Sequence, residues 1–325
     1  MVGPSWGLNR RKYWRNFETS RLDFIPDIFL KSLPRFRFTE SDFYETESSD
    51  FGEAIQIWAE KNNLFKKKNF IVSVGGMYGG YKAIQAAKPF ILSRLLSSRS
   101  ATANVYKTLS RLDKNKLFVT IHMRLGNDFS TPGGEADLRG KFNFALPMRW
   151  YENLCASLYQ ALGGRVEFLF LTDKPNAQFD LLVARYNGHR TDGLLLTECS
   201  DLLLMAFSDL RICSISSYSL AACYLSSGPY IWYEPQLSQS QGVYSIWGHE
   251  NRQLHPTSPS SQSAKYVTSA VFGDKVKLDG QGFPVDDEGK LPATLIQRLQ
   301  SRLVQNDWRT DLIQYGSAPL PGQRT

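Results

Sequence analysis

Between Lys116 and Tyr233, short apolar runs alternate with segments that carry helix signals. The runs are nearly unbroken, which is typical of strands buried on both faces of a parallel sheet. Predicted strands are 117–121, 166–171, 194–196, 211–215 and 230–233. Helices are predicted over 147–162, 175–187, 200–205 and 218–225, with Asp173, Ser200 and Ser217 as candidate N-caps. This alternation predicts a doubly wound parallel sheet, and hence a Rossmann-like domain over 116–245.

The segments on either side of this domain are less regular. Before it, a helix is predicted over 51–62, a strand over 69–74 and a helix over 81–96. The glycine-rich stretch 75–80 does not fit G-x-G-x-x-G in any register, which favours a tight turn or the lining of an interdomain cleft. After it, an amphipathic segment over 292–303 predicts a helix that either packs across the domains or faces solvent. We therefore expect an N-terminal domain over 1–115 and a C-terminal extension over 246–325.

The composition is that of a globular protein, because 42% of the 325 residues are hydrophobic and 21% are charged. The formal net charge of +7 permits an anionic partner, but the basic residues are scattered, with runs only at 10–12 and 66–68. No RNA-recognition or helix-turn-helix signature accompanies them, so nucleic acid is not expected as a partner.

Targeting signals and cysteine usage bear on the compartment. The sequence contains no signal-peptide pattern and no apolar stretch of about 18 residues, so any membrane contact is expected to be peripheral. The cysteines at 155, 199, 213 and 223 form no C-x-x-C pair, and the histidines at 122, 189, 249 and 255 show no metal-ligand spacing with them. Buried, reduced thiols are the better interpretation, and they favour a cytoplasmic location.

Polar side chains follow three of the predicted strands: His122 and Arg124, Thr172 and Asp173, and Ser216 and Ser217. The carboxyl ends of parallel strands meet at one edge of a sheet, where ligands bind in open α/β folds. An arginine beside Gly126 suits a phosphate or a carboxylate. Each residue also has a structural explanation, since Asp173 and Ser217 can be helix caps and His122 can be a hydrogen-bonded core histidine. The recurrence of polar residues at three strand ends favours a ligand-binding site over these structural explanations.

The same stretches resemble the motifs of the α-1,2-, α-1,6- and O-fucosyltransferase group. His122-x-Arg124-x-Gly126 looks like the family's H-x-R-x-G-D motif, and 168–173 (FLFLTD) resembles its second motif, a strand ending in Ser/Thr-Asp. The segment 201–219 (DLLLMAFSDLRICSISSYS) is similar to its third, D-L-x-L-M-x-x-C-x-x-x-I-x-x-N-S-S-F-S. The third match is the most specific, because it joins a helix, a strand and a Ser-Ser-aromatic-Ser turn in one register.

The resemblance implies a GT-B-like fold of two Rossmann-like domains, with an acceptor-side domain over 1–115 and the donor domain over 116–245. It implies an inverting glycosyltransferase that moves fucose from GDP-fucose to a hydroxyl of a glycan or glycoconjugate. No cofactor is expected besides this donor substrate, and no metal, because the sequence contains no D-x-D pair. Arg124 would face the charge on the leaving diphosphate, and Asp128 is the best candidate for the base. Donor-binding residues carried over are His122, Arg124, Gly126, Asp173, Ser216, Ser217 and Tyr218.

The sequence departs from the family pattern in several places. The Gly-Asp pair reads Gly126-Asn127-Asp128, a frequent second arginine is Leu125, and the N-terminal G-G-L-G-N-Q motif is absent, which suggests N-terminal truncation. Two alternatives therefore stay open. One is a transferase of the same fold that uses another nucleotide sugar, and the other is a non-catalytic domain that binds a nucleotide or a glycan.

Overall fold

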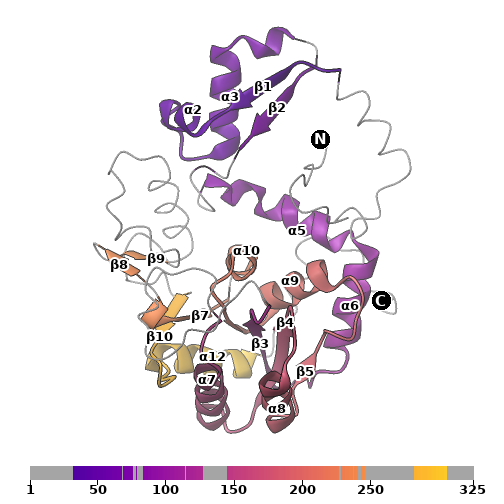
Figure 1. Ribbon diagram of the computed structural model, residues 1–325, viewed down its shortest axis with the longest axis vertical. Coiled ribbons are helices and arrows are strands. Elements are labelled where there is room, and N and C mark those ends of the chain that lie inside the picture. The colour runs from indigo at the N-terminus through magenta and orange to yellow at the C-terminus, as the bar shows by residue number, and fades with distance from the viewer. Residues whose placement is uncertain are drawn as a thin grey trace.

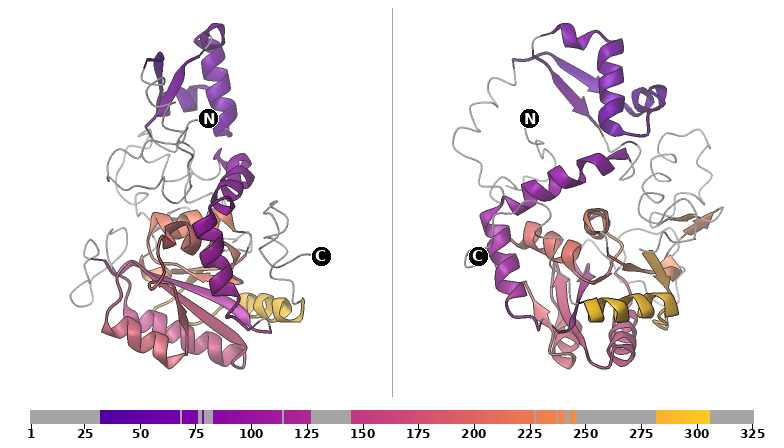
Figure 2. Two further views of the ribbon diagram at one scale, coloured as in Figure 1. Left: turned by 90° about the vertical axis from the view of Figure 1, so that its right-hand side faces the viewer. Right: turned by 180° about the vertical axis from the view of Figure 1, so that it is seen from behind.

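The structure, a computed structural model, describes residues 32–67, 69–75, 78, 83–113, 115–126, 145–226, 228–236, 238–240, 243–245 and 282–305. Figure 1 shows a smaller and a larger α/β unit. Helices α5 (Lys88–Leu96) and α6 (Arg99–Leu109) run one after the other from the smaller unit along the side of the larger one (Figure 2). The predicted α/β fold with a doubly wound parallel sheet in its C-terminal half is confirmed.

The smaller unit is built on two parallel strands, β1 (Arg35–Phe38) and β2 (Ile71–Val74). Helices α2 (Glu40–Glu45) and α3 (Phe51–Lys61) connect them, followed by the short η3 (Leu64–Lys66). Phe38, Phe43 and Trp58 pack together in its core. The helix predicted over 51–62 and the strand predicted over 69–74 are both present. In α3 the apolar periodicity matches burial, whereas the residues of β2 are half-buried or exposed.

The helix predicted over 81–96 is interrupted within the described residues, because Ala83 is helical but the regular helix α5 begins only at Lys88. It is preceded by η4 (Gln85–Ala87), and Pro89 lies in the first turn of α5. Proline lacks a backbone N–H and fixes φ, so the first turn of a helix accommodates it while the interior does not. Most of the glycine-rich stretch 75–80 and the basic run 10–12 lie outside the described residues.

The larger unit is a six-stranded parallel sheet in the order β10-β7-β6-β3-β4-β5. Its strands are β3 (Leu117–Met123), β4 (Val166–Thr172), β5 (His189–Arg190), β6 (Leu210–Ile212), β7 (Tyr230–Tyr233) and β10 (Gly282–Val285). Numbered in chain order within the sheet, this is 6-5-4-1-2-3, the strand order of the Rossmann fold. The chain starts at the centre with β3, fills one side, and then returns to β6 to fill the other.

Side chains of each central strand alternate between two cores, as the period of a strand requires. Val119 and Ile121 pack on one face, against α7 (Met148–Ala161), α8 (Ala177–Arg185) and α12 (Ala293–Gln305). Phe118 packs on the other, against α6 and α9 (Thr197–Phe207), with α10 (Ser217–Leu225) contributing to both cores. Every residue of β3 is buried, which confirms the strand predicted from the run 117–121.

Two strand predictions differ from the structure. The third strand is β5, whereas the predicted strand 194–196 is a connection in which Leu195 is exposed and Leu196 has a φ of 54°. The last strand is β10 rather than β7. Its Pro284 is tolerated because an edge strand need not donate on both sides. A Cβ on Gly282 would lie 2.7 Å from the ring of Tyr230, so the close approach of these strands requires glycine.

The segments flanking 116–245 also pack on this sheet. Leu92 and Val105, from α5 and α6, belong to one of its cores. Leu295 and Leu299 of α12 are fully buried in the other. The amphipathic face of α12 is thus covered by the larger unit rather than turned to solvent, while the expected domain boundaries stay predictions.

Three short elements follow β7: η5 (Glu234–Gln236) and the antiparallel pair β8 (Ser238–Ser240) and β9 (Val243–Ser245). All four cysteines are buried and free, as predicted. Within the described residues, no helix is long and apolar enough to cross a membrane.

Candidate functional site

The adjacent strands β3 and β6 form the topological switch point of the sheet. From β3 the chain proceeds through α7 to β4 on one side, and from β6 it proceeds through α10 to β7 on the other. The two connections diverge at this point, and Rossmann-like folds bind ligands in the crevice outside the carboxyl ends of strands at such a point. The predicted residues His122, Ser216 and Ser217 all lie at this point.

His122 is held at the end of β3 by two serine hydroxyls. Its Nδ1 lies 2.7 Å from Oγ of Ser219 and 2.9 Å from Oγ of Ser214, and the two hydroxyl oxygens are 3.5 Å apart. The ring of Tyr218 packs against the imidazole, with ring centroids 5.3 Å apart. Tyr151 donates a hydrogen bond to the carbonyl of His122. These contacts come from α7, the β6–α10 connection and α10, so His122 joins β3 to three other parts of the fold.

Burial lowers the pKa of His122 to about 4. Desolvation is the main cause, Asp173 opposes it, and Arg124 adds to it. The imidazole is therefore neutral near pH 7. A neutral imidazole has one protonated nitrogen and one acceptor nitrogen. If Nδ1 accepts a serine proton, Nε2 carries the ring hydrogen and is a donor.

Arg124 and Asp173 pair across neighbouring strand ends. The β3–β4 register places Met123 opposite Thr172, which brings the next residues together. Nη1 of Arg124 lies 2.6 Å from Oδ2 of Asp173, and the backbone N–H groups of Leu125 and Gly126 donate to Oδ1. About a quarter of each charged side chain is exposed. Asp173 therefore anchors the chain as it leaves β3, which explains why Gly126 lies at this rim.

Asp173 does not cap the following helix, contrary to the sequence-based expectation. The N-cap of α8 is Asn176, whose side chain accepts from the backbone N–H of Phe179. Asparagine and aspartate are equally good caps, so propensity alone did not distinguish the two positions. Pro175 also precedes the helix instead of lying in its first turn.

The start of α10 lies one residue earlier than expected. Ser216, rather than Ser217, is the N-cap, and its Oγ accepts from the backbone N–H of Tyr218. Ser217 is the first helical residue and is exposed. The helix N-terminus brings the positive end of its dipole and unsatisfied backbone N–H groups to the crevice.

The neighbouring helix α9 also begins earlier than predicted, at Thr197, and places Ser200 inside rather than at the cap. The hydroxyl of Tyr218 donates to the carbonyl of Glu198, which ties the start of α10 to α9. Burial raises the pKa of Tyr218, so its phenol is protonated. Burial also raises the pKa of Asp201, on the next turn of α9, to about 7, against hydrogen bonds from Thr191 and Thr197.

Two residues that the sequence analysis did not single out belong to this site, Ser214 and Ser219. Both lie in the 201–219 stretch, where the two central serines were chosen instead. The sequence signal for these two serines is their position relative to a strand end and a helix start. Ser214 closely follows β6, and Ser219 is the third residue of α10, so both can turn back toward β3. Asp128, the proposed base, lies outside the described residues.

The described part of the chain contains no group of three His, Cys, Asp or Glu residues that could hold a metal ion. The positive groups at the crevice are instead Arg124 and the N-terminus of α10. Together with a neutral imidazole, they can bind an anion such as a diphosphate through charge and N–H donors.

Comparison with known proteins gives limited information. No protein-family model and no curated protein sequence matches the chain. Among solved structures it is similar to a variant of the wall teichoic acid polymerase TagF, with 14% identity and a TM-score of 0.33, over 70% of this chain and 49% of that one. A second TagF variant, soaked with CDPG, matches with 12% identity and a TM-score of 0.30, over 69% and 49%. The chain thus spans about half the length of these structures, and similarity at this level carries no functional assignment.

Proposed function

We propose that the protein is a glycosyltransferase that binds the diphosphate of a nucleotide sugar at the β3–β6 switch point. One observation carries this proposal: Arg124, the neutral His122 with its two serines, and the N-terminus of α10 meet at that point. This is a set of donors and positive charge suited to a diphosphate. The motif resemblance adds fucose as the sugar, GDP-fucose as the donor and a glycan or glycoconjugate hydroxyl as the acceptor.

The chemistry follows from where charge develops. An acceptor hydroxyl attacks the anomeric carbon as the diphosphate leaves, and negative charge grows on the β-phosphate. A guanidinium has five N–H donors, so the contact of Arg124 with Asp173 through Nη1 does not by itself prevent it from facing that phosphate. Asp173 would orient the guanidinium, because it also holds the backbone beyond Arg124. Preorganised charge of this kind lowers a barrier without reorganisation during the reaction.

His122 would act as a hydrogen-bond donor rather than a cation. With its pKa lowered to about 4, it carries no charge near neutral pH. When Ser214 or Ser219 donates to Nδ1, Nε2 holds the proton and can donate it to a phosphate oxygen or a sugar hydroxyl. Tyr218 packs on the ring and limits its rotation. The proposal assigns the base to Asp128.

A transferase that uses a different nucleotide sugar is the second candidate. It is favoured by Leu125, which replaces the second arginine of the family pattern and packs partly buried against the core. A leucine in that position cannot contact a phosphate electrostatically, so a donor site here would differ from the family pattern.

A thermal-shift screen separates the candidates, because a ligand that binds only the native state raises its melting temperature. GDP, UDP, CDP and their sugar conjugates would be compared, followed by turnover of the stabilising donor with a panel of acceptor glycans, in buffer with and without EDTA. Stabilisation by GDP and EDTA-resistant turnover of GDP-fucose are expected. A preference for UDP or CDP would support the second candidate. GDP binding without turnover on any acceptor would indicate a binding domain, and stabilisation by no nucleotide would overturn the proposal.

A further inference from the structure

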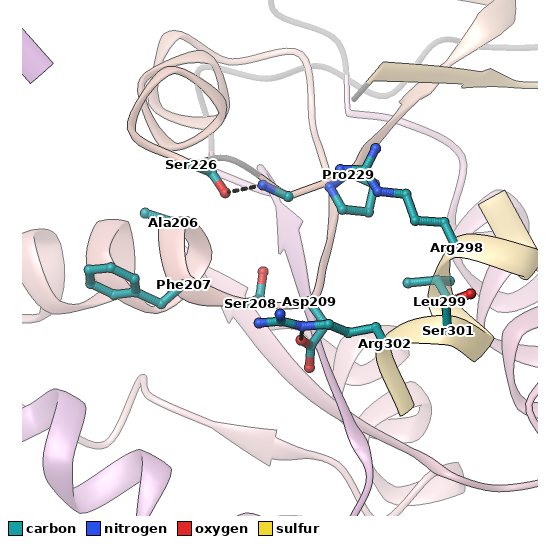
Figure 3. Close-up of a pocket in the computed structure, with 11 residues that line it drawn as sticks. Ala206, Phe207, Ser208, Asp209, Ser226, Pro229, Arg298, Leu299, Ser301 and Arg302 are labelled. Carbon is teal, nitrogen blue, oxygen red and sulfur yellow. Dashed lines mark hydrogen bonds and ion pairs between the residues drawn. The ribbon is translucent and has the colours of Figure 1, made fainter. Parts of the chain in front are cut away.

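A cavity of about 310 Å³ lies at the opposite end of the strands from His122, where the amino ends of β6 and β7 meet α12 (Figure 3). Polar groups from three parts of the chain line it: Ser208 and Asp209 before β6, Ser226 before β7, and Arg298 and Arg302 on α12. Because the strands are parallel, the cavity at their amino ends is separate from the candidate site at their carboxyl ends.

The single carboxylate among the described lining residues is already engaged by the fold. Oδ2 of Asp209 accepts the backbone N–H of Phe118, and Oδ1 lies 3.0 Å from Nε of Arg302. The Asp209 side chain is 2% exposed and that of Arg302 is 31% exposed, so the carboxylate is buried while the guanidinium is partly accessible to solvent. Arg302 thus offsets the charge of Asp209. Arg298, four residues earlier on α12, lies on the same helix face and adds a further positive charge.

Two more cations donate hydrogen bonds to backbone carbonyls of the lining residues. Arg211 is fully buried and donates to the carbonyls of Ala206 and Ser208 at the end of α9, where a positive charge is favourable. A Cβ on Gly228 would lie 2.4 Å from its Nη2, so only glycine permits the guanidinium to approach this loop. Lys88 donates from Nζ to the carbonyl of Ser226. Positive charge therefore exceeds negative charge around the cavity in the described part of the chain.

A hydroxyl completes the set of donors. Oγ of Ser226 accepts the backbone N–H of Gly228 at 3.0 Å, which fixes its position (Figure 3). With that oxygen serving as acceptor, the hydroxyl proton can be donated to a ligand. Guanidinium forks and a hydroxyl are the donors that phosphate oxygens accept.

We propose that this cavity is a second binding site, which takes a small phosphate-bearing anion held by Arg298, Arg302 and Ser226. Its volume is at the lower end of the range of about 300–1,000 Å³ for small-molecule pockets, which is more room than one inorganic phosphate needs. The site is independent of the proposed transferase activity, because it shares no residue with the switch point.

Calorimetric titration of the full chain with inorganic pyrophosphate at constant ionic strength tests the site. The parent is compared with Arg298→Gln and with Arg94→Gln, a matched control that removes the same charge from an exposed position on α5. Loss of a charge-assisted contact should weaken binding about tenfold or more in Arg298→Gln and leave Arg94→Gln like the parent. Arg298→Lys, which keeps the charge but not the planar fork, should fall between the two.

Hydrogen–deuterium exchange locates the bound pyrophosphate, since the anion could also bind at the switch point. Slower exchange over α12 and the segment 228–233 is expected in the parent, and this readout does not depend on any variant folding. Protection confined to the start of α10 would overturn the proposal. Equal weakening in Arg298→Gln and Arg94→Gln, or no measurable binding by the parent, would overturn it as well.

Discussion

At the scale of single residues, the switch point depends on one uncharged imidazole and one guanidinium. His122 is buried and is hydrogen-bonded by two hydroxyls, whereas Arg124 is partly exposed and paired with Asp173. The two residues lie two positions apart on the chain, but their environments differ because β3 ends between them. In the proposed site, the imidazole would contribute a directed hydrogen bond and the guanidinium would contribute charge.

Replacement of Arg124 tests the assignment of charge. We expect Arg124→Ala to abolish transfer within detection and Arg124→Lys to impair it severely, because lysine lacks the planar fork. The loss of such a contact typically costs roughly 10²–10³ in rate, and part of it should appear in kcat, since the leaving group is more charged in the transition state.

Asp173→Asn is the matched control for this series, because it removes the ion pair while keeping the cation and the side-chain oxygen acceptor. Its rate loss should be smaller than that of Arg124→Ala. The pair is partly exposed, with about a quarter of each side chain accessible, and a solvent-screened pair contributes about 0–1 kcal/mol, so both variants should unfold near the parent temperature. A folded Arg124→Ala protein with the parent's donor affinity and turnover would contradict the donor-site assignment.

The titration of His122 is a second test at this scale. NMR should show its ring signals unchanged from pH 8 to about pH 5, with a midpoint near 4, because burial disfavours the imidazolium. The unfolded chain binds this proton with a pKa near 6.5, so it holds more protons than the native state between those values. The contribution of His122 to stability is therefore complete above about pH 6.5 and is lost as the pH falls through 4. A midpoint near 6.5 would show that the imidazole is solvated.

At the scale of secondary-structure elements, the N-cap position distinguishes the structural role of Ser216 from the ligand-binding role proposed for Ser217. Ser216 closes the first turn of α10, while Ser217 is exposed beside it. A cap stabilises the native state whether or not a ligand is present, and an exposed hydroxyl at a helix start affects only what binds there.

We therefore expect Ser216→Ala to cost about 1 kcal/mol of unfolding free energy. Ser217→Ala should leave the melting temperature unchanged and raise the donor KM. Melting curves and donor kinetics on the two single variants decide the matter, since each serves as the control for the other. Unchanged kinetics in Ser217→Ala would remove that residue from the site.

At the scale of the whole molecule, the order of the strands determines where the candidate site lies. The connection after β3 runs to one side of the sheet and the connection after β6 runs to the other. Rossmann-like folds bind ligands where such connections diverge. At the other end of the strands, helix α12 and the residues that precede β6 and β7 form the cavity. One parallel sheet therefore carries candidate anion sites at both ends of its strands.

The pH dependence of global stability provides a test of the packing between α9 and α10. Asp201 has a native pKa raised to about 7, against 3.8 as its ordinary value. The native state binds more protons than the unfolded state between those values, so the contribution of Asp201 to stability falls as the pH rises from about 4 to about 7. Denaturant titrations of the parent and of Asp201→Asn should diverge over that window, with the variant less sensitive to pH. Parallel curves would show that Asp201 is solvated.

Much of the fold was predictable from the sequence because local signals and tertiary packing agree there. The buried strands β3 and β4 have continuous apolar runs, and Gly163-Gly164 ends α7 where predicted. Prediction failed for β5 and β10, which are a two-residue strand and an edge strand containing Pro284. A strand of two residues has no period to detect, and a proline inside a run argues against a strand, so only the neighbouring strand determines that these segments pair.

The sequence alone determined the doubly wound fold and placed His122, Arg124, Ser216 and Ser217 near one rim, because strand ends and helix starts leave local signals. Only the tertiary structure decided how these residues combine. It paired Arg124 with Asp173, assigned Ser214 and Ser219 to the imidazole and made Ser216 the cap. Those choices depend on the register between strands and on the position at which each helix starts. A shift of one residue turns a side chain to the other face, and only packing across the sheet fixes that residue.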